Sequence, residues 1–114
     1  MSNPNFMNGV PELLILRLLH GREMYGYELV QSIRAATQNE ISLGEGVVYP
    51  VLHGLERKKA IKSKRREVNG RIRLYYSVTP TGNKHLSKLA ADWERISGAV
   101  GGVLRGGENV SAAV

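Results

Sequence analysis

Cysteine is absent from this chain of 114 residues, so disulfide bonds, thiolate metal sites and a cysteine nucleophile are all excluded. Long hydrophobic runs are absent too: the longest unbroken apolar stretch is residues 13–16, against the roughly 20 residues that a membrane-spanning helix needs. The N-terminus lacks the basic region and apolar stretch of a signal peptide. We therefore expect a cytoplasmic protein with no membrane partner.

Residue groupings typical of catalysis or metal binding are also missing. The histidines His20, His53 and His85 fall on different expected elements, without a carboxylate or second histidine at ligand spacing. No serine–histidine–acid set and no pair of carboxylates converges on an expected cleft. We therefore expect no catalytic residues, no metal and no other cofactor, which makes an enzyme the least favoured class of protein.

Positive charge is abundant and concentrated in one segment. The formal net charge is +6, but residues 57–73 alone hold nine basic residues and one acidic residue. The local charge is therefore +8, and the rest of the chain sums to −2. Such a concentrated field is typical of a protein that binds a polyanion, although a solvated charged face is an alternative.

Three helices are predicted in the first half of the chain, which has the length of a single domain. The leucine-rich residues 10–20 predict a buried helix, and apolar residues at helical spacing predict a second that ends near Thr37. Ser42 and Glu45 have the spacing of a capping box and mark the start of a third helix, which should end near Lys58. Its inward stripe is expected to be Val48, Leu52 and Leu55.

Between Ile61 and Val78 the apolar period changes to 2, which predicts two β-strands. Asn69-Gly70 lies between them and tolerates the positive φ angles of a two-residue type I′ turn. The segment is therefore expected to be a basic β-hairpin. The residues expected to share the buried face of its second strand are Ile72, Leu74, Tyr76 and Val78.

A final helix is predicted from Pro80, because proline favours the first position of a helix. One long apolar stripe follows, and it needs a covering surface. A second copy of the chain is the economical partner, with packing onto its own domain as the alternative. The expected dimer interface is Leu86, Leu89, Trp93, Ile96 and Val100.

The predicted fold is thus mainly α with a small two-stranded β wing. It comprises a winged helix-turn-helix DNA-binding domain over residues 1–79, a C-terminal dimerisation helix over residues 80–104 and a flexible tail over residues 105–114. An α-helix fits the major groove of double-stranded DNA, about 12 Å wide, while a basic hairpin can follow the phosphates or enter the minor groove. The third helix is therefore expected to contact bases.

Several motifs, in this order along the chain, resemble the PadR family of transcriptional regulators. They are residues 25–29 (YGYEL), residues 48–52 (VYPVL) with Leu55-Glu56, and Gly70-Arg71 followed by residues 75–79 (YYSVT) and Gly82. The resemblance spans about residues 10–100 and implies a winged helix-turn-helix with a C-terminal dimerisation helix. It also implies a repressor that leaves its operator when a small molecule or another signal intervenes. Lys59 departs from the family's usual glycine, and Val47-Val48 from a pair containing threonine.

By that resemblance, the DNA-contacting positions are Tyr49 with the start of its helix, and Arg71 and Arg73 in the wing. His53 lies one turn after Tyr49 and is either a DNA contact or a solvated side chain. The full expected set is Gly46, Val47, Tyr49, Pro50, His53, Arg57, Lys64, Arg66, Asn69, Gly70, Arg71 and Arg73.

Trp93 is the only tryptophan, and core packing is its simplest interpretation. The alternative follows some relatives of the family, in which aromatic residues of this helix line a pocket for a planar apolar small molecule at the dimer interface. Two other functions for a winged helix also stay open. One is a protein–protein interaction module without specific DNA binding, and the other is recognition of structured RNA.

Overall fold

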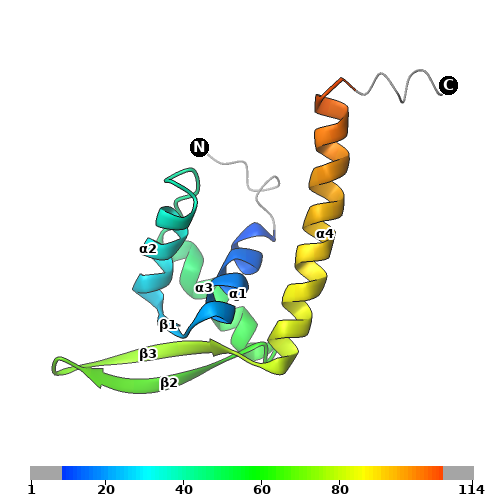
Figure 1. Cartoon of the computed structure of the whole chain (residues 1–114). Helices are drawn as coiled ribbons and strands as arrows, with labels where there is room; N and C mark the ends of the chain where they lie inside the picture. Colours follow the sequence, from blue (N-terminus) through cyan, green and yellow to red (C-terminus); the bar gives the residue numbers. More distant parts are fainter. Residues whose placement is uncertain (1–8, 107–114) are drawn as a thin grey trace.

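The computed structural model describes residues 9–106, which form four helices and a three-stranded sheet (Figure 1). The helices are α1 (Val10–Gly21), α2 (Gly26–Ala36), α3 (Glu45–Arg57) and α4 (Pro80–Leu104). The strands are β1 (Met24–Tyr25), β2 (Ile61–Val68) and β3 (Arg71–Val78). The predicted class, mainly helical with a small sheet, is confirmed.

A single core joins α1, α2 and α3 to one face of the sheet. Val48, Leu52 and Leu55 of α3 are fully buried, which confirms the predicted inward stripe. Burying a large apolar side chain contributes about 1.5–3 kcal/mol, so this core holds the three helices together. The other side chains with at most 3% exposure are Ile15, Leu16, Leu19, Leu29, Ile33, Ala60, Ile61 and Tyr76.

The sheet has three strands where the sequence predicted two. The added strand is β1, which pairs with β3 through Met24↔Tyr76 and Tyr25↔Tyr75 to give the order β1-β3-β2. Two residues are too few for a period of 2 to be recognised, so this strand could not be predicted from the sequence. Because β1 is so short, it covers only the part of β3 that lies beside the helices.

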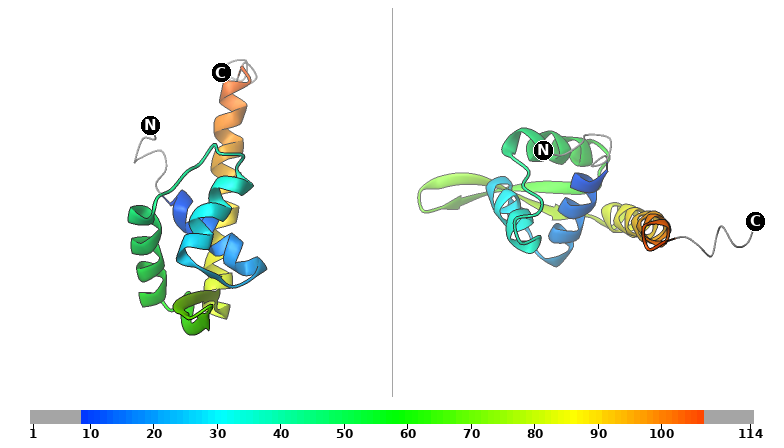
Figure 2. Two further views of the ribbon diagram at one scale, coloured as in Figure 1. Left: turned by 90° about the vertical axis from the view of Figure 1, so that its left-hand side faces the viewer. Right: turned by 90° about the horizontal axis from the view of Figure 1, so that it is seen from above.

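The hairpin of β2 and β3 closes as predicted. Residues 61–68 pair antiparallel with residues 71–78, and Asn69 and Gly70 have φ angles of 52° and 77°. This hairpin is called the wing below, and its outer half extends beyond the helices as an arm (Figures 1 and 2). Ile72 and Leu74 are therefore 63% and 45% exposed, so their predicted burial is wrong.

The start of α3 differs from the prediction. Gly44 is its N-cap, and no side chain caps the helix. The predicted capping box of Ser42 and Glu45 is therefore wrong. Ser42 Oγ instead accepts a hydrogen bond from Arg34 Nε of α2, at 3.3 Å, so the hydroxyl links the loop to the preceding helix.

Thr79 fixes the junction between the hairpin and α4. Its hydroxyl accepts a hydrogen bond from the backbone N–H of Gly82 at 3.0 Å, which makes Thr79 the N-cap of α4. The same hydroxyl lies 2.7 Å from the carbonyl oxygen of Lys59 and 3.0 Å from that of Ala60. Lys59 has a φ of 63°, a left-handed conformation that costs a residue other than glycine roughly 1–2 kcal/mol.

The first turns of α4 pack against α1, and the rest of the helix extends past the other three helices (Figure 2). Glu12 of α1 lies 3.0 Å from His85 Nε2 of α4 and 3.1 Å from Lys58 Nζ. Burial raises the pKa of Glu12, but the hydrogen bonds to His85 and Lys58, together with the charge interactions with the same two residues, outweigh it, so the pKa lies below its usual value. This carboxylate thus joins α4 to the end of α3.

Length alone does not make α4 a membrane helix. Among residues 9–106 no helix has both the length and the apolar character that crossing a bilayer requires, although α4 has 25 residues.

Candidate nucleic-acid interface

The exposed face of α3 carries five of the expected DNA-binding residues. Gly46, Pro50, His53 and Arg57 follow one another at intervals of four, three and four residues, which places them on one side of the helix. Val47 lies beside them and is 42% exposed. The structure thus brings these residues together on a surface that no other described element covers.

Tyr49 lies at the flank of this face and is half-buried. Its ring packs across Gly26, the first residue of α2, where a Cβ atom would come within 2.7 Å of Tyr49 Cε1. Only glycine allows this approach. The rings of Tyr49 and His53 are tilted to each other with centroids 6.4 Å apart, so Tyr49 also supports the exposed histidine.

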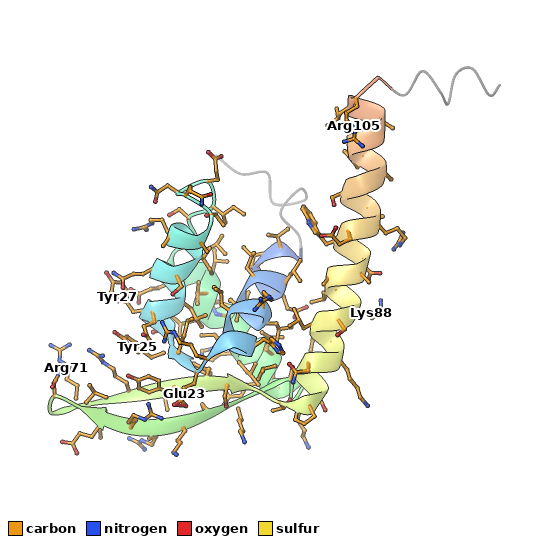
Figure 3. The ribbon with its side chains drawn as sticks, viewed as in Figure 1. Glu23, Tyr25, Tyr27, Arg71, Lys88 and Arg105 are labelled. Carbon is orange, nitrogen blue, oxygen red and sulfur yellow. The ribbon has the colours of Figure 1, made fainter. Side chains whose placement is uncertain are left out.

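One face of the wing is strongly basic. In the register of β2 and β3, Arg66 lies opposite Arg73, and Lys64 lies opposite Tyr75. Because directly paired residues and residues two apart share a face, five basic side chains gather on the same side. They are Lys62, Lys64, Arg66, Arg71 and Arg73. Arg71 projects from the ribbon next to the turn (Figure 3).

Two tyrosines on this face stack against two of the arginines. The guanidinium of Arg66 lies 4.4 Å from the centre of the Tyr75 ring, and that of Arg73 lies 4.3 Å from the centre of Tyr25. The two rings meet edge to face with centroids 5.4 Å apart. Glu23, just before β1, forms an ion pair with Arg66. Neither tyrosine nor Glu23 was among the expected site residues, and the contacts of Tyr25 and Glu23 with the wing depend on β1.

A hollow of about 240 Å³ lies between the wing and the helices. It connects Tyr49 of α3 with the outer, uncovered part of β3. The residues that line it are Tyr25, Gly26, Tyr49, Ile72, Arg73, Leu74 and Tyr76.

A second exposed surface lies on α4 and is apolar. Trp93, Ile96 and Val100 are 45%, 50% and 51% exposed, and Val103 and Leu104 continue the stripe. Leu86, expected in the dimer interface, is only 8% exposed and belongs to the core of its own chain. A hollow of about 260 Å³ lies beside the stripe; it is lined by Gly9, Val10, Leu13, Leu89, Asp92, Trp93 and Ile96.

Metal-ligating side chains do not cluster in residues 9–106: no group of three or more histidine, cysteine or acidic residues there could hold an ion. An exposed third helix followed by a basic two-stranded wing defines the class of winged helix-turn-helix proteins.

The model of the PadR-like family of transcriptional regulators matches residues 15–88. The chain belongs to this family, as its motifs predicted. A curated relative, the transcriptional regulator Rv3488 of Mycobacterium tuberculosis, is 31% identical over 83 residues, which are 73% of this chain and 75% of that protein.

Solved structures agree with the assignment. A transcriptional regulator from Clostridium thermocellum matches with a TM-score of 0.80 and 30% identity, over 85% of this chain and 95% of that one. A PadR-like transcriptional regulator from Bacillus cereus matches with a TM-score of 0.77 and 29% identity, over 90% and 98%. The winged-helix architecture is therefore shared over nearly the whole of these relatives.

Proposed function

We propose that this chain is a homodimeric repressor that binds pseudo-palindromic operator DNA and is released by a small molecule or another signal. One observation carries the proposal: the exposed face of α3 leads directly into a wing with five basic side chains on one face. A helix in the major groove beside a basic ribbon on the phosphates is the docking geometry of winged helix-turn-helix proteins. The PadR-like family supports the regulatory role.

The wing and the exposed face of α3 would have different roles in DNA binding. Lysines and arginines of the wing contact phosphates and supply most of the affinity through release of counterions. Val47, Pro50 and His53 on α3 are exposed and contact base edges, and the first two of them lie in the first two turns of the helix. Tyr49 is half-buried, so its contribution includes holding the His53 ring in place. Asn69 and Gly70, at the wing tip, approach the backbone or the minor groove.

Alanine substitutions separate these roles. Arg71→Ala or Arg73→Ala is expected to weaken binding to operator and random duplex by similar factors. The slope of log affinity against log salt concentration should fall by about 1 for each phosphate contact that a protomer loses. Tyr49→Ala or His53→Ala should weaken operator binding more than random binding. Fluorescence anisotropy at several salt concentrations measures both quantities, with the exposed Lys84→Ala on α4 as the control. Equal losses for all four variants would show that α3 does not contact bases.

A protein–protein interaction module is the alternative, favoured by one observation. The wing face opposite the basic one exposes Ile72 and Leu74. Exposed apolar side chains of this size are uncommon on a surface that binds only phosphates. A footprint on the promoter of the chain's own gene distinguishes the two functions. Protection of two similar half-sites about 10 base pairs or a multiple apart supports the repressor, and no protection at any promoter supports the module.

Release from DNA would depend on the hollow beside Trp93. We propose a planar apolar effector, because Trp93 is 45% exposed and lines this hollow together with Leu13 and Leu89. Such a ligand releases DNA only if it binds more tightly to the arrangement that does not fit the operator, and DNA must then weaken ligand binding by the same factor.

Aromatic compounds that act at this hollow are expected to quench the fluorescence of Trp93 and to lower operator affinity in parallel. Trp93→Ala should abolish the response to ligand while dimerisation and operator binding persist. Leu104→Ala, on the same helix but outside the lining of the hollow, is the control. If Trp93→Ala dissociates the dimer instead, the indole ring serves packing and the effector site lies elsewhere.

A further inference from the structure

Arg66 and Arg73 face each other across β2 and β3, and both stack on a tyrosine ring. Like charges directly opposite in a sheet repel each other, so this pair needs compensation. The structure compensates them unequally. In residues 9–106, Arg66 is the one basic residue of the wing that has an acidic partner, and that partner is Glu23.

Glu23 reaches Arg66 because of the short strand that the sequence did not reveal. It directly precedes β1, whose pairing with β3 brings residues 43 positions apart in the chain into contact. Figure 3 shows Glu23 beside the hairpin. Both side chains remain partly in solvent, with 36% exposure for Glu23 and 41% for Arg66. The guanidinium of Arg66 thus lies over the Tyr75 ring, and its Nη2 contacts the Glu23 carboxylate.

A DNA phosphate would bind the same N–H donors of Arg66 that Glu23 contacts. A guanidinium binds phosphate and carboxylate oxygens through the same fork of N–H groups, so the two anions compete. The Tyr75 ring keeps the Arg66 side chain in position, while the Glu23 carboxylate neutralises the charge of Arg66 in the absence of DNA. We propose that Glu23 is an internal substitute for phosphate that masks Arg66 and lowers the sequence-independent affinity of the wing for any duplex. The inference rests on the proposed DNA-binding function.

The charge of Glu23 is tested by Glu23→Gln, which keeps the length of the side chain and a hydrogen-bond acceptor. Affinity for operator and for random duplex is expected to rise by about threefold or more per protomer at low salt. A gain of this size matches the attraction between two unit charges a few ångströms apart in water. The plot of log affinity against log salt should steepen by about 0.9 per protomer, because Arg66 then releases a counterion of its own.

Glu67→Gln is the matched control. Glu67 is exposed, follows Arg66 in the same strand and carries the same charge, but strand alternation places it on the opposite face. Arg66→Gln provides the second control, since Glu23→Gln should have no further effect in its background. Thermal unfolding of each variant shows whether the fold is intact.

The inference is overturned if Glu23→Gln leaves affinity unchanged or lowers it, if Glu67→Gln raises affinity equally, or if the gain persists without Arg66. Failure of the proposed function looks different. In that case the wild-type chain itself binds no duplex at low salt, which would overturn both statements. A gain specific to Glu23 and dependent on Arg66 supports the masking.

Discussion

Gly82→Ala is expected to lower the free energy of unfolding by about 3 kcal/mol, the upper end of the range for an overpacked site. A Cβ atom at this position would overlap the carbonyl oxygen of Ala60 and come within 2.9 Å of its carbonyl carbon and 2.7 Å of Val78 Cγ2. The obstacle is largely backbone, at the start of β2, and it cannot rotate away. Gly82 also donates its N–H to the hydroxyl of Thr79, so a shift of α4 would break the N-cap.

Urea unfolding followed by circular dichroism measures the effect. Gly98→Ala is the control on the same helix, because a Cβ atom there meets nothing within 4 Å. That substitution should stabilise the protein by about 0.5–1 kcal/mol through helix propensity. If both variants unfold at the same urea concentration as the wild type, the close approach of α4 to Ala60 is not what fixes the base of that helix.

The elements that could be predicted are those whose signal is local. The buried stripe of α3 follows from residues three and four apart, and the turn at Asn69-Gly70 follows from the φ angles that only a few residue types tolerate. Pro80 correctly marked the start of α4. In each case the residues that carry the signal are neighbours in the chain, so no knowledge of the fold was needed.

The features that were missed depend on contacts between distant residues. Strand β1 exists because β3 offers an edge, and the stacking of Arg73 on Tyr25 is visible only once that pairing is known. The burial of Ile72 and Leu74 was overestimated because alternation defines a face but not how far the helices extend along it. Likewise Leu86 continues the apolar stripe of α4, yet it lies where that helix still packs on its own domain.

Ile96→Glu is expected to convert the protein into monomers and to reduce operator affinity at least a hundredfold. The stripe of α4 exposes Trp93, Ile96 and Val100 by about half each, and no described element of the same chain covers them. A symmetric dimer would bury this face against its own copy. A carboxylate at position 96 would then meet apolar surface without a partner, whereas in the monomer it points into water.

The loss of DNA binding follows from the loss of the second half-site. In a dimer, the second wing and α3 bind at the high effective concentration set by the first, which raises affinity about 10²–10⁴-fold without any new contact. Ala91→Glu is the control, because Ala91 is exposed and lies five residues from Ile96, near the opposite side of α4. Sedimentation at micromolar concentration and operator binding are measured for both variants. A monomeric wild type would show that each chain binds its half-site alone, and an Ile96→Glu variant that stays dimeric would show that the stripe is not the dimer interface.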